Sequence, residues 1–299
     1  MGRKVYIKRH WSGAGKWIYE GYKRAWERLG YSVVYYNSLD EINGRKNKYY
    51  VMALGGDVNS DIALQKIKES QKTFLYVQPN EFPDPWGTHP NFQCHCPLDY
   101  IQKINDLDNV HLWAFGNTDK YHTKWKKVNY IPLAFDHIGY KPEKEKAFEF
   151  DVCFVGGWAD NGFNEKQEIM LSHFNALKKL DIKLGIAVNQ GISDQEEATL
   201  LYNSKIALNL HDQYQRVLGT DSNERTFKSL GLTGFLICDA VTEVTNLFPS
   251  VPTAEDVDSF VSLVEKYLKE DLSDIKEDNR KLILDEHTYV HRVKALLEL

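Results

Sequence analysis

Short apolar runs alternate with longer amphipathic segments from the start of the chain. Val5-Tyr6-Ile7 lies within a β-rich run, and residues 17–29 carry apolar side chains at helical spacing. Further strand-like runs occupy 31–36, 49–54 and 73–78. Strands that alternate with helices pair in parallel through right-handed crossovers. The pattern predicts an open, doubly wound α/β sheet whose ligand-binding edge lies at the carboxyl ends of its strands.

The alternation pauses near the middle of the chain and then restarts. Residues 110–115 and 128–132 resemble the last strands of the first series, and 136–149 is a polar, Lys/Glu-rich passage. The second series has expected strands at 151–155, 183–188, 205–210 and 235–238, and expected helices at 165–180, 194–202, 222–230 and after 254. A chain of 299 residues suits two lobes of roughly 120–160 residues each. We therefore predict two Rossmann-like lobes, 1–136 and 150–299.

Composition places the chain among globular proteins. No apolar run approaches the roughly 18–20 residues of a membrane helix, and the N-terminus has no apolar signal core. These features favour a soluble, cytoplasmic protein. Cys153 and Cys238 lie in apolar runs, where buried thiols are expected. Cys94-His95-Cys96 does not have the usual zinc spacing, so no metal site is expected.

The net charge of −5 conceals a basic N-terminal region. Lys and Arg outnumber Asp and Glu within the first 50 residues. A basic face could follow a nucleic-acid backbone while a tryptophan stacks on a base, or it could be a solvated helix face. The residues concerned are Arg3, Lys4, Lys8, Arg9, Lys16, Lys23, Arg24 and Arg28, with Trp11, Trp17 and Trp86 available for stacking.

The first strand leads into His10-Trp-Ser-Gly-Ala-Gly-Lys16. A Walker loop needs Gly and Ser or Thr where this chain has His10 and Trp17, and a dinucleotide fingerprint needs a third glycine at Ile18. Two glycines before a helix still permit close backbone approach by a polar acceptor or an anion, although a plain tight turn explains them too. Gly13, Gly15 and Lys16 are therefore acceptor-side candidates.

A second glycine pair follows the first strand of the second lobe. Gly156 and Gly157 could let a phosphate or sugar approach the main chain, and Trp158 could stack on a base or sugar. A turn and ordinary packing are the alternatives for these residues.

The stretch from His211 to Gly231 carries the most specific pattern. A buried strand delivers a polar loop containing Arg216, and Ser222 or Asn223 can cap the helix that follows. Arg225 then lies in the first turn, where the helix dipole does not favour a cation, so an anionic partner is expected. A diphosphate suits the guanidinium, and a carboxylate such as Glu224 or Asp221 is the alternative.

Three segments resemble the C-terminal lobe of CgeB-like spore-maturation glycosyltransferases, members of the GT-B superfamily. They are Tyr202–Leu210, Asn223-Glu-Arg-Thr-Phe227 and Gly231–Asp239. The end of the chain from Glu286 to Arg292, and Tyr130–Asp136, are similar to that family as well. The resemblance implies two lobes facing across a cleft, with a nucleotide-sugar donor, UDP-linked by default, on the C-terminal lobe. Asn223, Arg225, Lys228 and Asp239 are its donor-side positions here.

One position departs from the family pattern. Glutamate usually follows the aromatic residue of the Asn-x-Arg-x-aromatic motif and is expected to hold the donor ribose, but this chain has Lys228. Lysine cannot accept hydrogen bonds from hydroxyls. Glu224, Asp239 or Glu243 could replace it, the donor could lie differently, or donor use could have been lost.

Catalytic candidates lie in the first lobe. An inverting transfer needs a base within hydrogen-bond reach of the acceptor hydroxyl, and His10, Glu81 and Asp84 are the candidates. A retaining transfer needs no strong base. No metal is required, because Arg216, Arg225 and a helix start can stabilise a leaving diphosphate.

The favoured hypothesis is transfer of a hexosyl or pentosyl group from a nucleotide sugar to an acceptor hydroxyl. The acceptor could be a glycan, a protein or a hydroxymethylated base in DNA. A nucleotide-sugar epimerase and a non-catalytic nucleotide- or nucleic-acid-binding protein of the same shape are the alternatives.

Overall fold

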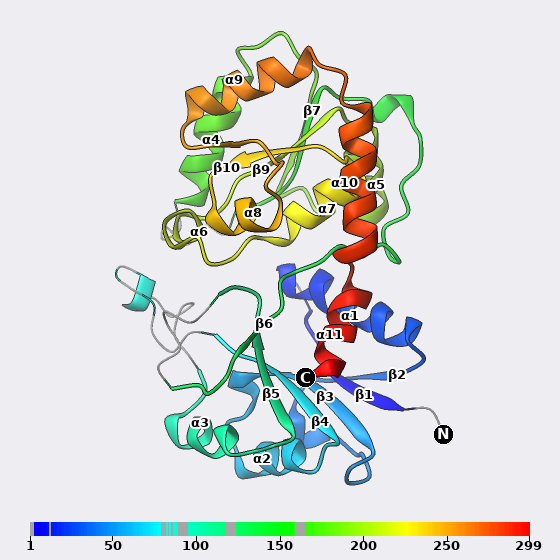
Figure 1. Cartoon of the computed structure of the whole chain (residues 1–299), viewed down its shortest axis with the longest axis vertical. Coiled ribbons are helices and arrows are strands. Elements are labelled where there is room, and N and C mark those ends of the chain that lie inside the picture. Colours follow the sequence, from blue (N-terminus) through cyan, green and yellow to red (C-terminus); the bar gives the residue numbers. More distant parts are fainter. Residues whose placement is uncertain are drawn as a thin grey trace. The chain divides into compact units, whose positions relative to one another are not determined.

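The computed structural model describes residues 3–11, 13–78, 82, 84, 86–88, 95–117, 124–158 and 165–299. The chain forms two compact units, one made of residues 1–132 with 289–299 and the other of 133–288 (Figure 1). The terminal helix was expected in the second lobe but belongs to unit 1. Among the described residues, no helix has the length and apolarity needed to cross a membrane.

Unit 1 is built on a six-stranded parallel sheet in the order β2-β1-β3-β4-β5-β6. Its elements are β1 (Lys4–Lys8), α1 (Gly13–Arg28), β2 (Ser32–Tyr36), β3 (Tyr49–Leu54), α2 (Asp61–Lys68), β4 (Lys72–Tyr76), α3 (Leu98–Asn105), β5 (Val110–Ala114), β6 (Asn129–Tyr130) and α11 (Tyr289–Glu298). The predicted alternation of strands and helices is present, although α1 begins at Gly13 rather than near residue 17.

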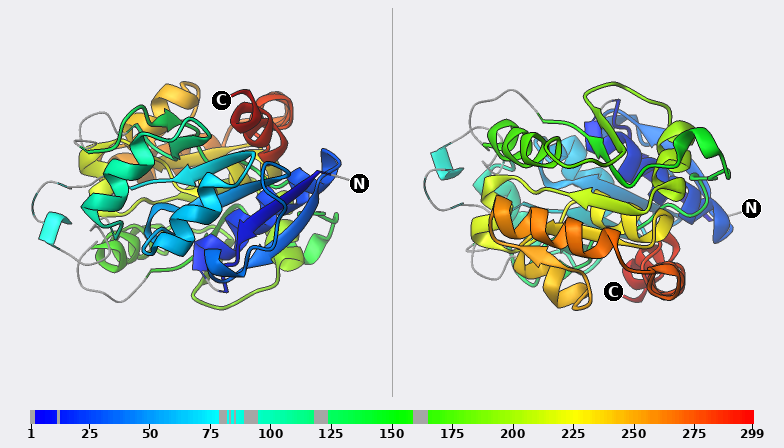
Figure 2. Two further views of the ribbon diagram at one scale, coloured as in Figure 1. Left: turned by 90° about the horizontal axis from the view of Figure 1, so that it is seen from below. Right: turned by 90° about the horizontal axis from the view of Figure 1, so that it is seen from above.

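Side chains alternate between the two faces of this sheet, as the period of a strand requires. One face packs against α2 and α3 through a cluster that includes Tyr6, Val51 and Leu75. The other face packs against α1, where Trp26 contacts the rings of Tyr50 and Phe74. Figure 2 shows unit 1 in its left-hand view.

The terminal helix α11 packs closely on α1. Tyr289 contacts the ring of Tyr22 at 4.8 Å between centroids, and a side chain at Gly21 would overlap the Tyr289 ring. Arg292 donates to the Pro132 carbonyl oxygen at 2.9 Å. These buried contacts explain why the last helix belongs to unit 1.

Unit 2 is built on a five-stranded parallel sheet in the order β11-β10-β9-β7-β8. Its elements are β7 (Val152–Gly156), α4 (Lys166–Leu177), β8 (Leu184–Val188), α5 (Asp194–Asn203), β9 (Ile206–Asn209), α6 (Gln213–Leu218), α7 (Glu224–Leu232), β10 (Leu236–Asp239), α8 (Thr242–Leu247), β11 (Thr253–Ala254), α9 (Val257–Leu268) and α10 (Ser273–Glu286).

Helices cover both faces of the unit 2 sheet (Figure 1; Figure 2, right). The core on one face joins Phe154 and Leu208 to Phe174 of α4 and Phe260 of α9. On the other face lie α5, α7 and α10. Gly234 ends α7 with φ +80°, a conformation that suits glycine, and Asn279 of α10 donates to its carbonyl oxygen. Each unit is thus a doubly wound α/β layer structure, as the alternation of strands and helices predicted.

Candidate functional site

Buried polar side chains gather at the carboxyl edge of the unit 2 sheet. Asn209 ends β9, His211 follows it, and Asp239 ends the neighbouring strand β10; all three have no exposed surface. In open parallel sheets this edge is where ligands bind. We call the group formed by Asn209, His211, Asp239 and the start of α7 the edge network.

Arg225 lies in the first turn of α7, as predicted, and reaches back over the sheet edge. Its Nε donates to the Val155 carbonyl oxygen at 2.7 Å and its Nη1 to Asn209 Oδ1 at 2.9 Å. A side chain at Gly156 would overlap Arg225 Nη2, so glycine is needed there. No described carboxylate lies within 4.0 Å of the guanidinium, although Glu197, Asp212, Glu224 and Asp239 favour its charge from farther away. Burial lowers the pKa of Arg225.

Asn209 holds the helix start in place. Its Nδ2 donates to Asn223 Oδ1 at 2.9 Å and to Thr226 Oγ1 at 2.8 Å, while its Oδ1 accepts from Arg225 Nη1. Asn223 is the N-cap of α7, as predicted, but its side chain accepts from Asn209 rather than from the helix. Asn209 is a site residue that was not predicted from the sequence. It could have been found from the sequence as a polar residue at the end of an otherwise apolar, buried strand.

Asp239 is the anchor of the network. Its carboxylate accepts from the backbone N–H of His211 at 2.9 Å and lies 2.6 Å from His211 Nδ1. Burial opposes ionisation of Asp239, but these contacts prevail and lower its pKa. His211 Nε2 lies 3.2 Å from Ser222 Oγ on the other side of the ring. A carboxylate used in this way is not free to hold a ligand's hydroxyls.

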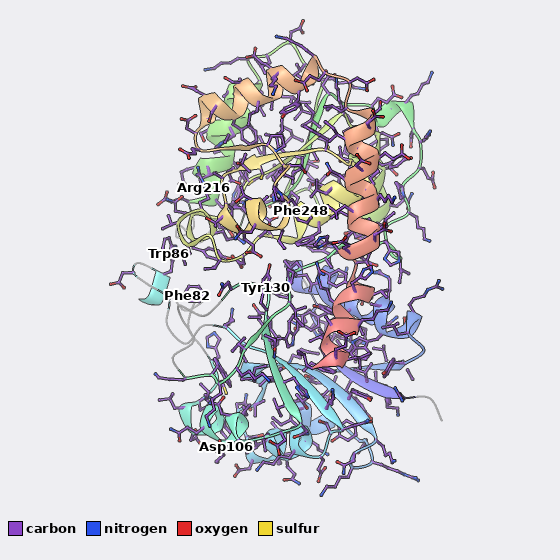
Figure 3. The ribbon with its side chains drawn as sticks, in the orientation of Figure 1. Phe82, Trp86, Asp106, Tyr130, Arg216 and Phe248 are labelled. Atoms are coloured by element: carbon purple, nitrogen blue, oxygen red, sulfur yellow. The ribbon has the colours of Figure 1, made fainter. Side chains whose placement is uncertain are left out.

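Arg216 was expected in a loop but lies on the short helix α6 (Figure 3). Its Nε is 3.4 Å from Asp239 Oδ2, and its Nη2 donates to the Glu255 carbonyl oxygen at 3.3 Å. The guanidinium is partly exposed. Lys166, which was not predicted as a site residue, donates to the Leu210 carbonyl oxygen and lies 3.6 Å from Asp212. Burial lowers the pKa of Lys166 to about 8.

The second glycine pair is held close to its neighbours. A side chain at Gly157 would overlap Asn189 Oδ1. Trp158 is half-buried and packs against the core beside α4, and its carbonyl oxygen accepts from Asn189. Of the three candidates, only Gly156 contacts the Arg225 guanidinium. Trp158 has a packing role that does not depend on a ligand.

Lys228 faces α5, away from the other donor-side candidates. Its Nζ forms a 2.6 Å ion pair with Glu197 and lies 4.0 Å from Glu224, and it donates to the Tyr140 hydroxyl at 3.4 Å. Both partners of the ion pair are buried. Burial disfavours the charge of Lys228, but the two carboxylates outweigh it and raise its pKa. The structure thus separates Lys228 from the edge network.

Two carboxyls beside this edge each have a buried oxygen without a partner among the described residues: Asp221 Oδ1, and Oε1 of Glu243 at the start of α8. Burial raises the pKa of each to about 7. Glu243 is 6% exposed, and no described side chain donates to it. Gly219, the C-cap of the preceding helix α6, packs against Thr242, the residue before Glu243.

His10 lies at the carboxyl end of β1 in unit 1 and borders a cavity of about 300 Å³. We call this the His10 cavity; its lining residues are His10, Gly15, Ile18, Tyr19, Leu54, Gly55, Gly56, Tyr76, Gln78, His95, Phe115 and Trp125. The imidazole stacks on Tyr19 at 4.3 Å. A side chain at Gly15 would lie 2.7 Å from His10 Nδ1, so glycine leaves room for the ring. Burial lowers the pKa of His10, which keeps the ring neutral.

The remaining first-lobe candidates are dispersed. Gly13 and Lys16 are exposed in the first turn of α1 and do not line the His10 cavity. Asp84 is exposed. Glu81 and Cys94 lie outside the described residues, while Cys96 is buried beside the Val58 carbonyl oxygen.

The comparisons with known proteins agree with this architecture. A family model described as glycosyl transferase-like matches residues 144–298. The structure is similar to that of AviGT4, a glycosyltransferase involved in avilamycin A biosynthesis, with a TM-score of 0.62, 11% identity, and coverage of 99% of this chain and 96% of that one. No curated protein matches the sequence.

An alpha-glucosyltransferase solved with UDP is similar as well, with a TM-score of 0.54, 10% identity, and coverage of 97% of this chain and 96% of that chain. An alpha-glucosyltransferase solved with UDP and a 13-mer DNA containing an HMU base gives a TM-score of 0.52, with 10% identity and coverage of 97% of this chain and 95% of that chain. At these identities the likeness establishes the GT-B fold and no more.

Proposed function

The chain belongs to the glycosyl transferase-like family, and we propose that it transfers a sugar from a nucleotide diphosphate sugar to an acceptor hydroxyl. The observation that carries this proposal is Arg225, a cation at the carboxyl edge of the unit 2 sheet with no described carboxylate within 4.0 Å. A half-buried guanidinium with no carboxylate in direct contact can bind a diphosphate, whose oxygens match its forked donors.

The donor site in this proposal is the edge network together with Arg216. Arg225 Nη2 lies against Gly156, whose lack of a side chain makes room for the guanidinium at this edge. The start of α7, capped by Asn223, adds the positive end of a helix dipole. Arg216 supplies a second cation, and Gly157 and Trp158 border the site. UDP is the first nucleotide to test, because the alpha-glucosyltransferase of similar fold was solved with it.

The acceptor in this proposal binds in the His10 cavity, and His10 is the base. The acceptor oxygen forms a bond to the anomeric carbon, whose bond to the phosphate oxygen breaks with its electron pair passing to the leaving diphosphate. The acceptor proton passes to the neutral imidazole, whose Nε2 has no partner among the described residues. This assignment implies inversion at the anomeric carbon. Glycans, proteins and hydroxymethylated DNA remain the acceptor classes, and the CgeB-like branch remains the proposed subfamily.

Glu243 is our candidate for the glutamate that Lys228 replaces. Asp239 is bonded to His211, and Glu224 lies beside Lys228, whereas Glu243 Oε1 has no partner among the described residues. A carboxylate with a free oxygen can accept bonds from the ribose hydroxyls.

Glu243→Gln is expected to weaken UDP binding about 10-fold, because a hydrogen bond to a charged group is lost. With the pKa of Glu243 raised to about 7, wild-type affinity should rise between pH 6 and 8 as the carboxyl ionises, and this rise should be absent in the variant. Calorimetric titration measures both effects, with the exposed Glu265→Gln as the matched control. Equal affinity in Glu243→Gln and wild type would remove Glu243 from the site.

Incubation with a panel of nucleotide sugars separates sugar transfer from the two alternatives. Accumulation of free nucleotide indicates transfer or hydrolysis, as proposed. An isomerised donor would indicate an epimerase instead, and a thermal shift without turnover would indicate binding alone.

A further inference from the structure

We propose that His211 positions Arg225 for the diphosphate without touching the ligand itself. Its neutral imidazole, oriented by Asp239, holds Ser222 and thereby the start of α7. This inference rests on the proposed function and adds the residue that fixes the geometry of its donor site.

His211 is fully enclosed at the carboxyl edge of the unit 2 sheet. It lies two residues beyond the end of β9, and neither its side chain nor that of Asp239 has exposed surface. The Asp239 carboxylate accepts from the His211 backbone N–H and lies 2.6 Å from Nδ1. The contacts of Asp239 lower its pKa, and an ionised carboxylate only accepts, so Nδ1 carries a hydrogen. An enclosed ring acts on a ligand only through its neighbours.

The hydrogen bonds around Asn209 assign the other ring nitrogen of His211. Asn209 Nδ2 has two hydrogens, and its bonds to Asn223 Oδ1 and Thr226 Oγ1 use both. Thr226 therefore accepts from Asn209 and gives its own hydrogen to Ser222 Oγ at 2.6 Å. The Ser222 hydrogen then goes to His211 Nε2 at 3.2 Å rather than to the Asn223 carbonyl oxygen at 3.5 Å. Nε2 is thus an acceptor, and the imidazole is neutral.

This chain of hydrogen bonds takes the place of the usual helix cap of α7. Asn223 is the N-cap, but its side chain makes no bond to a helix N–H. Ser222, which precedes it, is tied instead to the first turn of the helix and to His211. Asn209 completes the chain, because its Oδ1 accepts from Arg225 Nη1 at 2.9 Å. His211 therefore fixes the helix start and, with it, the guanidinium.

Calorimetric titration of UDP measures the positioning effect. His211→Asn offers a donor to Asp239 but is too short to accept from Ser222. It should weaken UDP binding about 3- to 10-fold, the effect of losing one hydrogen bond. Ser222→Ala breaks the chain at the next bond and should weaken binding by a similar factor. In an Arg225→Ala background neither change should weaken binding further, because both act through that guanidinium.

Ser262→Ala is the matched control, because its hydroxyl donates to the Asp258 carbonyl oxygen on the exposed side of α9. It should leave UDP affinity unchanged.

Nitrogen NMR of the whole protein gives a readout that reduced stability alone would not change. The His211 ring should be neutral with its hydrogen on Nδ1, and the Arg225 Nε–H signal should shift in Ser222→Ala. The ring is identified by its absence from the His211→Asn spectrum. If that variant does not fold, it is identified as the ring whose signals change in Ser222→Ala.

UDP affinity that both His211→Asn and Ser222→Ala leave unchanged overturns the inference and leaves the proposed donor site intact. Losses that persist in the Arg225→Ala background also overturn it, and so does a ring with a hydrogen on Nε2. If wild type binds no nucleoside diphosphate, the proposed function fails, and the Arg225 Nε–H signal decides the inference alone. A shift of that signal in Ser222→Ala then supports it, and an unchanged signal overturns it.

Discussion

Arg225→Ala is expected to lower sugar-transfer turnover by about 10²- to 10³-fold, the effect of removing one positioned group that stabilises developing charge. The guanidinium is held by the Val155 carbonyl oxygen and Asn209 Oδ1, with Nη2 lying against Gly156. Such a preorganised cation stabilises the leaving diphosphate without rearranging. Initial rates of nucleotide release at saturating donor measure the change.

Arg225→Lys serves as the graded control. A lysine keeps the charge but lacks the forked donors that reach both Val155 and Asn209, so an intermediate loss is expected. Arg280→Ala removes a guanidinium that donates to the Leu232 and Thr233 carbonyl oxygens at the carboxyl end of α7, away from the edge network. It should lower the melting temperature while largely retaining turnover. A folded Arg225→Ala protein with wild-type turnover would contradict the assignment.

His10→Gln is expected to lower kcat by about 10²- to 10⁴-fold, the usual contribution of a general base, while leaving donor affinity unchanged. Glutamine keeps a polar side chain of similar size but cannot take the acceptor proton at neutral pH. His111→Gln is the control, because His111 is also a half-buried histidine of unit 1 but lies near the amino end of β5.

The pH profile of kcat provides a second measure of His10. A base must be unprotonated to act, and burial lowers the pKa of His10 below its ordinary 6.5. Wild-type kcat should therefore be level above pH 6.5 and fall as the pH drops through the lowered pKa. His10→Gln should lack that acid limb. If His10→Gln keeps the acid limb, the limb belongs to another group, and His10 has a positioning role.

Much of the fold could be predicted, because burying one face of a helix or strand spaces its apolar residues at the period of that element. The strands β7 and β9 and the helices α5 and α7 lie within a few residues of their expected positions. The terminal helix could not be assigned to unit 1 in this way. Its docking depends on Tyr289 meeting Gly21 of α1, a contact between residues far apart in the sequence.

The site was predictable only in part. Arg225 at the start of α7 followed from the position of the N-cap and the helix dipole. Its partners, the Val155 carbonyl and the Asn209 amide, depend on how two neighbouring strands, β7 and β9, end side by side. The direction of Lys228 depends on Glu197, which lies in another helix. The His10 cavity combines loops and strands of unit 1, so no local pattern could reveal Tyr19 and Trp125 as its walls.

Calorimetric titration of UDP into wild-type protein and Arg225→Ala tests the central claim most directly, because it measures diphosphate binding at the edge network without needing the acceptor. We predict saturable binding with one site per chain in wild type and at least a 10-fold weaker affinity in Arg225→Ala, the cost of losing a charge-assisted contact. Absence of binding by any nucleoside diphosphate, or equal affinity in the two proteins, would contradict the proposed donor site.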